Sequence, residues 1–314
     1  MKPKEKIFVV VNPEAGGGRG RVLWPQAAQE LKKKLGTFDF EESTAIGHAQ
    51  YLAADAAKAG YTVITAFGGD GTVHEVANGL MEADASSRPA LGIICVGTGA
   101  DLVKTLGIPP GLSDQIRIAA GTKSRRVDLG RVRYTSLSGG VESRYFVNIA
   151  SAGLGAEVVR RAPRFRSFLG RKPAYLAATL DAYLHWKPQK VTIKTEHGTA
   201  AGVAWPDKPL IVAIANGRFF GGGMPIAPGA DPSDGYFDLV AIGQFPAYQV
   251  PVALSLLYSK QIHRLKQVRH DRVRRVELAS EGRVDLDIDG EPIGSLPAVF
   301  EIIPSALEVK APSP

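Results

Sequence analysis

The first 125 or so residues alternate apolar, strand-like runs with amphipathic, helix-like runs, and this rhythm limits the available folds more than any other feature. The apolar runs are "KIFVVVN" (6–12), "FDFEEST" (38–44), "YTVITAFGG" (61–69) and "LGIICVGTG" (91–99). The helix-like runs that follow them are "WPQAAQELKKKL" (24–35), "HAQYLAADAAKA" (48–59), "VHEVANGLMEA" (73–83) and "DLVKTLG" (101–107), with Pro25 expected in a first helical turn. Apolar strands that each lead into a helix are typical of a parallel sheet covered by helices. The sequence therefore predicts an N-terminal α/β domain.

After about Arg125 the pattern changes to short strand-like runs separated by turn residues, which is typical of an antiparallel β domain. These runs are "RRVDLGRVRY" (125–134), "SRYFVNIASAG" (143–153), "QKVTIKTEHG" (189–198), "TAAGVAW" (199–205), "PLIVAIANG" (209–217), "YFDLVAIG" (236–243), "RRVELAS" (274–280), "RVDLDIDG" (283–290) and "AVFEIIP" (298–304). Two helical runs, 171–186 and 246–265, interrupt them. A chain of 314 residues suits about two domains.

Glycine-rich loops follow three of the predicted strands: "NPEAGGGRG" (12–20), "FGGDGT" (67–72) and "GTGAD" (97–101). The carboxyl ends of parallel strands line the ligand crevice of an open α/β sheet, and glycines there let a ligand approach the backbone. Helix N-termini behind such loops favour anions. The three loops together indicate a nucleotide site, although glycines also serve simply to make turns.

Asp70 stands in the middle of the second loop, where a bare carboxylate would repel a phosphate. The chain has no G-x-x-x-x-G-K-[ST] motif, and Gly69-x-Gly71-x-x-His74 lacks the third glycine of a dinucleotide fingerprint. An acid is reasonable here if Mg2+ lies between it and the phosphates, since Mg2+ uses one or two carboxylates plus phosphate oxygens. We therefore expect a nucleotide bound together with Mg2+.

The bulk composition favours a cytoplasmic protein with anionic partners. The formal net charge is +7, and a single cysteine, Cys95, excludes a disulfide framework and suits a reducing compartment. The apolar part of the N-terminus is too short for a signal peptide, and no apolar run is long enough to span a bilayer. Cys95 lies in an apolar run without a flanking base, so we expect a buried strand thiol.

Five motifs occur in the order in which diacylglycerol-kinase-type lipid kinases carry them. They are "VVNPEAGGGRG" (10–20), "FGGDGTVHEVANGL" (67–80), "GIICVGTGADLVKTLGIP" (92–109), "IANGRFFGGGMPIAPGADPSDGYFDL" (214–239) and "LDIDGEP" (286–292). The chain most resembles bacterial lipid kinases of that family, with sphingosine and ceramide kinases as more distant relatives. The GGDGT motif alone is less specific, since NAD kinases and phosphofructokinases carry similar loops. The two later motifs make the resemblance much sharper.

The resemblance implies an N-terminal NAD-kinase-like α/β domain (1–128), a C-terminal antiparallel β-sandwich domain that takes the lipid substrate (129–298), and a final segment (299–314) that packs back on the first domain. It implies ATP and Mg2+ as cofactors, with the nucleotide in the cleft between the domains. The nucleotide contacts it implies are Thr44, Gly69, Asp70, Gly71, Thr72, Val73, His74, Glu75 and Thr98. Glu291 matches the general base, with Asp289 beside it and Asp70 at the phosphates; Asp234 matches a structural Mg2+ ligand, with carbonyls from Asp231 and Tyr236.

One position departs from the family pattern. The family reads G-T-x-N-D after the fourth strand, whereas this chain has Ala100 in place of the asparagine. Ala100 removes a side-chain amide from the expected nucleotide edge, and a lost hydrogen bond there weakens binding by about 1 kcal/mol. Full activity and the usual nucleotide preference are therefore in question.

Simple turns are the alternative interpretation of the late acidic motifs. Asp289-Gly290 is also a strong hairpin signal, which without the resemblance would make Glu291 an exposed turn acid. Asp231 and Asp234 lack the full acidic set of an EF-hand and could likewise be turn formers. With the resemblance we favour the base and metal interpretations, because a lipid hydroxyl must lose its proton to act as a nucleophile.

Two basic runs, 160–172 and 260–275, are either solvated surface, or basic side chains on strand edges, or a site for an anionic membrane face. The first run also carries Phe165, Phe168 and Leu169, which suits peripheral membrane docking. No groove-reading or zinc motif points to nucleic acid. The sequence leaves monomer and homodimer open.

We therefore expect an ATP- and Mg2+-dependent lipid kinase, with a diacylglycerol-like lipid as the leading substrate, at the inner face of the membrane. The alternatives are a soluble-substrate kinase of the NAD kinase type and a nucleotide-responsive membrane-binding protein with weakened catalysis. Ala100 is the only observation that favours the membrane-binding protein with weakened catalysis.

Overall fold

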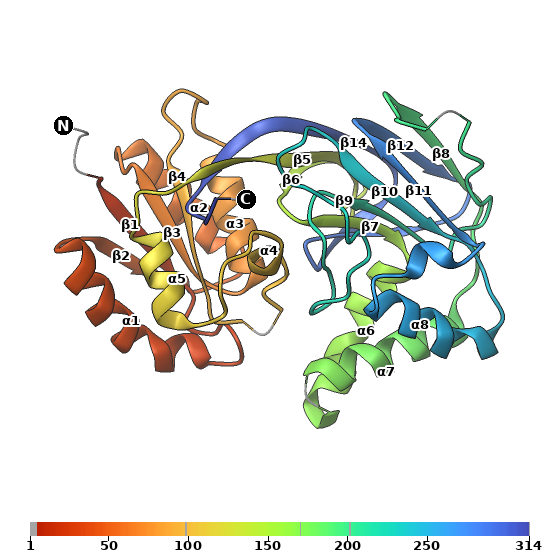
Figure 1. Cartoon of the computed structure of the whole chain (residues 1–314), viewed down its shortest axis with the longest axis horizontal. Coiled ribbons are helices and arrows are strands. Elements are labelled where there is room, and N and C mark those ends of the chain that lie inside the picture. Colours follow the sequence, from red (N-terminus) through yellow and green to blue (C-terminus); the bar gives the residue numbers. More distant parts are fainter. Residues whose placement is uncertain (1–4, 98, 170, 201, 314) are drawn as a thin grey trace. The chain divides into compact units, whose positions relative to one another are not determined.

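The computed structural model describes residues 5–97, 99–169, 171–200 and 202–313. The chain forms two compact units: the first contains Met1–Leu129 and Pro304–Pro314, and the second contains Gly130–Ile303. Each unit is described separately below, and Figure 1 labels the elements of both.

The first unit is a parallel sheet with helices on both faces. Its elements are β1 (Ile7–Val11), α1 (Arg19–Leu35), β2 (Asp39–Glu42), α2 (His48–Lys58), β3 (Val63–Gly68), α3 (Asp70–Leu80), β4 (Ala90–Cys95), α4 (Asp101–Thr105) and α5 (Leu112–Ala119). The strand order is β2-β1-β3-β4, all parallel, and the end of β14 (Glu291–Val309) adds a parallel pair between Val309 and Leu91. The predicted α/β fold of this half is confirmed.

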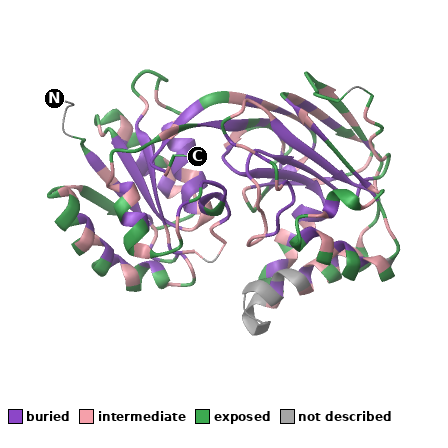
Figure 2. Ribbon diagram, viewed as in Figure 1, coloured by how far each residue is buried: buried purple, intermediate pink, exposed green. Residues whose placement is uncertain are grey.

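Side chains on one face of β1 belong to a large core cluster of this unit. Val9 and Val11 are buried in one cluster with Trp24 of α1, Phe67 of β3 and Ile116 of α5. Helices α2 and α3 pack together in the same unit, as Figure 1 shows. Strands β3 and β4 are almost entirely buried (Figure 2), which explains their continuous apolar sequences.

Four local features of this unit differ from what the sequence indicated. Helix α1 begins at Arg19, so Pro25 lies inside the helix and not in its first turn. Strand β2 is exposed along its whole length, because it is an edge strand of this sheet. Helix α5 had no counterpart among the expected elements, because it follows the turn-like "IPPG" segment and is short. Cys95 is the last residue of β4 and is half-buried rather than buried.

The second unit is an antiparallel β-sandwich, as expected. Its elements, besides the strands shared with the first unit, β5 (Arg125–Ser136) and β14, are β6 (Val141–Phe146), β7 (Ile149–Gly153), α6 (Leu154–Leu169), α7 (Arg171–His185), β8 (Val191–Glu196), β9 (Ile211–Ala215), β10 (Phe237–Ile242), η1 (Ala247–Gln249), α8 (Val250–Tyr258), η2 (Ile262–Arg264), β11 (Val268–Val273), β12 (Arg275–Ser280) and β13 (Asp285–Ile288). One layer has the order β11-β10-β9-β7-β13-β14, and the other joins β8, β12, β14, β5 and β6.

Strand β14 belongs to both layers of the sandwich. Its first residues pair with β13, and Ala298–Glu301 pair with β12. The core between the layers contains Phe146, Phe237 and Phe300, and the rings of Phe146 and Phe237 stack at 5.5 Å. Two predicted strands differ: "SRYFVNIASAG" is broken at residues 147–148 into β6 and β7, and the described part of "TAAGVAW" contains no strand.

Among the described residues, no helix is both long enough and apolar enough to cross a bilayer.

Candidate active site

Hydrogen bonds join the three loops at the carboxyl edge of the parallel sheet. Asn12, just after β1, donates from its main-chain nitrogen to the Phe67 carbonyl (2.9 Å) and from Nδ2 to Thr72 Oγ1 (2.9 Å). Val96, just after β4, donates its amide to the Gly68 carbonyl at 2.8 Å. A Cβ at Gly16 would lie 2.8 Å from the Val96 carbonyl oxygen, so the first and third loops also meet closely. The glycine-rich loops therefore form one continuous rim.

Asp70 fastens the GGDGT loop to the start of α4. Its Oδ2 accepts a hydrogen bond from the Ala100 amide (2.9 Å), and its Oδ1 accepts one from the Asp101 amide (3.0 Å). These two bonds hold the GGDGT loop against the N-terminus of α4. The expected role of Asp70 beside a phosphate-bound Mg2+ stays a prediction.

Ala100 contacts Asp70 through its backbone and not through its side chain. It is the N-cap of α4, with φ +52° and ψ 37°, a left-handed conformation that alanine adopts at a cost and asparagine more readily. The adjacent Gly99 is tightly enclosed, because a Cβ there would lie 2.3 Å from Asp70 Oδ2. The asparagine of the family pattern therefore has a conformational reason at this position. Thr98, the neighbouring nucleotide contact expected from the sequence, lies outside the described residues.

The remaining residues of the expected ATP loop divide into a ligand-accessible part and a structural part. Gly69, Asp70 and Gly71 are half-buried at the rim, whereas the side chains of Thr72, Val73 and His74 are buried in the first unit. These three can therefore meet a nucleotide only through their main chain. The Gly69 N-cap makes no side-chain capping bond, so the start of α3 suits an anion.

Glu75 supports a neighbouring helix. Its Oε1 accepts a hydrogen bond from the Gly47 amide (2.9 Å), and its Oε2 accepts one from the Ala49 amide (3.0 Å), at the N-terminus of α2. Thr44 lies exposed before the same helix, with its hydroxyl 3.1 Å from His48 Nδ1. The acid at Glu75 thus holds in place the segment that carries Thr44.

The late motif forms a two-residue hairpin turn between β13 and β14. Asp289 (φ +50°) and Gly290 (φ +86°) are both left-handed, and Ile288 pairs with Glu291. Two consecutive positive φ angles with an Asp-Gly sequence are the signature of a type I′ turn. Asp289 and Gly290 therefore form the hairpin turn that their sequence indicates, and Glu291 is the first residue after it.

Asp289 anchors this turn to the start of β7. Its Oδ2 accepts the Val147 amide (2.9 Å), and its Oδ1 accepts the amides of Asn148 (2.9 Å) and Ile149 (3.0 Å). The Asp289 amide in turn donates to the Ile149 carbonyl at 2.9 Å. This carboxylate is therefore committed to the backbone, so it positions the turn and is poorly placed to take a proton from a substrate.

Asn148 extends the same network toward the glycine-rich 217–224 segment, and sequence reasoning missed it. Its Nδ2 donates to the Phe219 carbonyl (2.7 Å), and its own carbonyl accepts the amides of Asn216 and Gly217, both at 2.9 Å. Its Oδ1 is buried and accepts no hydrogen bond within the described part of the chain. A single asparagine inside a strand-like run does not indicate a functional role in the sequence. Only the break between β6 and β7 at this position distinguishes Asn148 from an ordinary strand residue.

Glu291 is the accessible carboxylate of the turn. Its side chain is 30% exposed, and its Oε2 lies 4.0 Å from Arg144 Nη1. On the strand before the turn, Asp287 is buried and accepts a hydrogen bond from the Ser151 hydroxyl. Burial raises the pKa of Asp287 to about 7, the Ser151 bond opposes this shift and the nearby Asp289 adds to it. Of the three acids, Glu291 is therefore the one that a substrate hydroxyl could reach.

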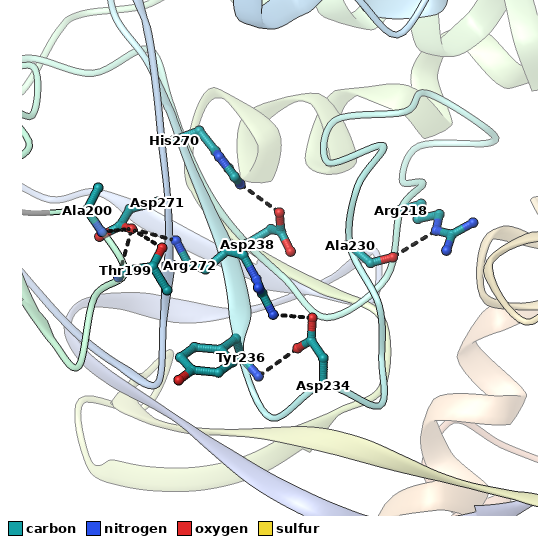
Figure 3. Close-up of polar contacts among 10 residues, drawn as sticks. All are labelled: Thr199, Ala200, Arg218, Ala230, Asp234, Tyr236, Asp238, His270, Asp271 and Arg272. Carbon is teal, nitrogen blue, oxygen red and sulfur yellow. Dashed lines mark hydrogen bonds and ion pairs between the residues drawn. The ribbon is translucent and has the colours of Figure 1, made fainter. Parts of the chain in front are cut away.

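The three residues of the expected structural metal site lie within the 231–236 turn, and Figure 3 shows two of them, Asp234 and Tyr236. The Tyr236 amide donates to Asp234 Oδ1 at 2.9 Å, and the Arg272 guanidinium pairs with Asp234 Oδ2. Asp231 Oδ1 accepts the amide (3.1 Å) and the hydroxyl (2.6 Å) of Ser233. Burial raises the pKa of Asp234 above its usual value, although the Tyr236 amide and Arg272 act in the opposite direction. Within the described residues, no group of three or more His, Cys, Asp or Glu side chains could hold a metal ion.

Some basic side chains in the described parts of the two basic runs pair with acids. In the first run, which belongs to α6 rather than to a strand edge, Arg160 pairs with Glu157 (2.6 Å) and Arg161 with Asp181 (2.6 Å). The side chains of 166–172, including Phe168 and Leu169, lie outside the described residues. The second run includes β11, an edge strand of its sheet, where His270 lies 2.6 Å from Asp238 Oδ1. The ion pairs of Arg160 and Arg161 neutralise part of the positive charge of the first run.

Two family models match the two halves of the chain. The model of the diacylglycerol kinase catalytic domain matches residues 6–132, and that of the YegS C-terminal NAD kinase beta sandwich-like domain matches residues 148–311.

Curated relatives and solved structures agree with these matches. A Chromohalobacter salexigens protein named "Probable lipid kinase YegS-like" is 31% identical over 85% of this chain and 81% of its own, and one of the same name from Yersinia enterocolitica is 28% identical over 98% and 96%. Crystal structures from Bacillus anthracis str. Sterne share the fold: one is 23% identical with a TM-score of 0.78, and another, of a diacylglycerol kinase, is 20% identical with a TM-score of 0.71. Both cover 98% of this chain and 97% of their own. The two matched domains and the curated relatives show that the chain belongs to the YegS-like, diacylglycerol-kinase-type family of lipid kinases.

Proposed function

We propose that this lipid kinase transfers the γ-phosphoryl group of ATP, bound with Mg2+, to a hydroxyl of a diacylglycerol-like lipid. The proposal rests on the different surroundings of the two acids at the "DGE" turn, Asp289 and Glu291. Asp289 is saturated by three backbone amides, while Glu291, two residues later, is left half-exposed. A rigid turn that presents one accessible carboxylate suits a general base.

In the proposed reaction, the carboxylate of Glu291 accepts the proton of the lipid hydroxyl. The hydroxyl oxygen attacks the γ-phosphorus of ATP, the bond between that phosphorus and the β–γ bridging oxygen breaks, and ADP leaves with the electron pair. The products are a phosphorylated lipid, ADP and a proton. Arg144, 4.0 Å from Glu291, supplies a positive charge beside the base.

The rim of the first unit is proposed to bind the nucleotide. The amides at the start of α3 and the glycine loops suit the phosphates, and Asp70 is the acid that would hold a phosphate-bound Mg2+. That ion, when bound, would neutralise charge that develops on the transferred group. Thr44 and the main chain of Thr72, Val73 and His74 are the further contacts proposed from the family pattern.

A radiolabelled-ATP assay with a lipid panel tests the proposal. We expect phosphorylation of diacylglycerol-like lipid by the wild-type chain, and loss of most turnover in Glu291→Gln with ATP affinity retained. Glu142→Gln is a matched control, because Glu142 is an exposed acid on β6 whose contact is the Tyr134 hydroxyl at 3.3 Å. Undiminished turnover in Glu291→Gln would remove Glu291 as the base, and phosphorylation of NAD without lipid would reverse the substrate class.

Peripheral attachment to an anionic membrane surface is a separate part of the proposal. Its support is the basic, aromatic-bearing run at 160–172 together with the net charge of +7. Sedimentation with vesicles that contain or lack anionic lipid tests it. Binding to both kinds of vesicle alike, or to neither, would contradict an electrostatic attachment.

A further inference from the structure

Asp234 has a cation beside it that belongs to the chain itself. The Arg272 guanidinium donates through Nη2 to Asp234 Oδ2, while the Tyr236 amide donates to Oδ1 at 2.9 Å (Figure 3). Both oxygens of the carboxylate are therefore engaged. The side chains are 39% (Arg272) and 26% (Asp234) exposed, so the pair is only partly screened by solvent.

The Arg272 guanidinium is also held from a second direction. Its central carbon lies 4.8 Å from the centroid of the Tyr236 ring, and that of Arg274 lies 4.7 Å from the same centroid. Cations within about 6 Å of an aromatic face are attracted to it. Tyr236 therefore binds Arg272 with its ring and Asp234 with its amide, and it brings the two charges together.

The backbone around Arg272 is fixed independently of this contact. Arg272 pairs with Asp238 in the antiparallel β10–β11 ladder. The preceding residue, Asp271, is buried and accepts hydrogen bonds from the amides of Thr199 (3.1 Å), Ala200 (2.9 Å) and Arg272 (2.8 Å). Strand register and these bonds aim Arg272 at the 231–236 turn, so its place beside Asp234 is built into the sheet.

A magnesium ion fits this turn poorly. Mg2+ requires a near-octahedral shell of oxygens at about 2.0–2.1 Å. Asp234 would have to give up Arg272, the Asp231 carbonyl already accepts the Asp234 amide (3.4 Å), and Asp238 is buried against His270. A doubly charged ion would also lie close to two guanidinium groups, whose repulsion opposes its binding.

We propose that the guanidinium of Arg272 is the counter-ion of Asp234 in this chain and takes the place of the structural magnesium ion that the family pattern predicts there. The 231–236 turn is then held without metal. The inference does not depend on which substrate is phosphorylated, and it leaves the magnesium ion that accompanies ATP untouched.

Metal-free full-length protein, prepared by dialysis against chelator and kept without ATP, provides the first test. Thermal unfolding is followed with millimolar MgCl2 and with NaCl of equal ionic strength, and bound magnesium is counted by elemental analysis. We expect the same unfolding midpoint in both salts and no stoichiometric magnesium. One magnesium ion per chain that is lost in Asp234→Asn would overturn the proposal.

Substitution of the two arginines provides the second test. Arg272→Gln and Arg274→Gln each remove a guanidinium from the Tyr236 ring, but of the two only Arg272 hydrogen-bonds Asp234 among the described contacts. We expect Arg272→Gln to lower the midpoint by several degrees more than Arg274→Gln, and Arg272→Lys, which keeps the charge, to lie close to the wild type. Equal midpoints for Arg272→Gln and Arg274→Gln would contradict the proposal. If Arg272→Gln does not fold, the magnesium count on the wild type still decides.

Discussion

The carboxylate of Asp289 accepts the main-chain amide of Asn148 at 2.9 Å, across a separation of 141 residues in the sequence. This bond and its two neighbours fix the turn that precedes Glu291 to the start of β7. Through Asn148 the same network reaches the 216–219 segment. The orientation of the proposed base therefore depends on residues from three distant parts of the chain.

Asp289→Asn is expected to lower turnover while ATP affinity is kept. Asparagine accepts the left-handed conformation, but its amide group cannot accept the hydrogen bonds of one carboxylate oxygen. Loss of a hydrogen bond to a charged acceptor costs about 1.5–3 kcal/mol. We expect kcat to fall at least about tenfold, since about 1.4 kcal/mol corresponds to that factor. Asp285→Asn, at the start of β13 and paired with Arg283, is the control. Equal kcat values in the two variants would contradict a positioning role.

Ala100→Asn is expected to stabilise the protein. Alanine at φ +52° is strained by about 1 kcal/mol or more, and asparagine adopts this conformation at lower cost. Urea unfolding should show a gain of about 0.5–1 kcal/mol. The matched control is Ala120→Asn, because Ala120 caps α5 with an ordinary right-handed φ of −84°. A loss of stability at position 100 as large as that at position 120 would show that strain does not decide the effect.

Glu75→Ala is expected to destabilise the first unit through α2 rather than through the nucleotide. The substitution leaves the Gly47 and Ala49 amides without their carboxylate, and loss of a helix N-terminal cap costs about 1–2 kcal/mol. Glu82→Ala removes a nearby acid that contacts Gln50 at the surface, and should stay within about 0.5 kcal/mol of the wild type. Chemical denaturation measures both. If the variant binds ATP less tightly at unchanged stability, Glu75 acts on the nucleotide directly.

Asp287 is expected to make the protein less stable as pH rises from about 4 to 7. Its pKa is about 7 in the folded protein, against an ordinary value of 3.8, so between these limits the folded state holds a proton that the unfolded state has released. Above pH 7 both states are ionised and the effect is constant. Asp287→Asn cannot titrate, so its stability relative to the wild type should increase between pH 5 and pH 8 by on the order of 2 kcal/mol.

Urea unfolding at several pH values measures this difference. Ser151→Ala gives a second check, because the Ser151 hydroxyl bond opposes the rise in the pKa of Asp287, and its removal should move the midpoint of the pH dependence upward. A difference between Asp287→Asn and the wild type that does not change with pH would exclude this titration.

The sequence predicted those features of the structure that depend on neighbouring residues alone. The Asp289-Gly290 turn and the loop before α3 follow from backbone preferences that glycine and aspartate carry wherever they occur. The parallel sheet follows from the apolar runs at β1, β3 and β4. Edge position is not local, so the exposure of β2 could not be read from "FDFE".

The partners of the acids could not be predicted, because they come from distant parts of the chain. Asp234 meets Arg272 38 residues away, and Asp289 meets Asn148 141 residues away. Nothing in either local sequence specifies its partner; only the strand register of the sandwich does so. Glu75 is the reverse case: its motif position indicates a nucleotide contact, whereas in the structure it accepts hydrogen bonds from the amides at the start of a neighbouring helix.

Residues 304–314 complete the first unit, although they follow the whole second unit in the sequence. They add Val309 beside Leu91, accept a hydrogen bond from Arg88 at the Ala306 carbonyl (2.6 Å), and bring buried Lys310 to Glu5 at 2.5 Å. During translation these residues emerge after all of 130–303. The N-terminal domain therefore lacks its last strand until the whole sandwich has been synthesised. A stop codon just after residue 303 would remove that strand and destabilise the half of the protein that was made first.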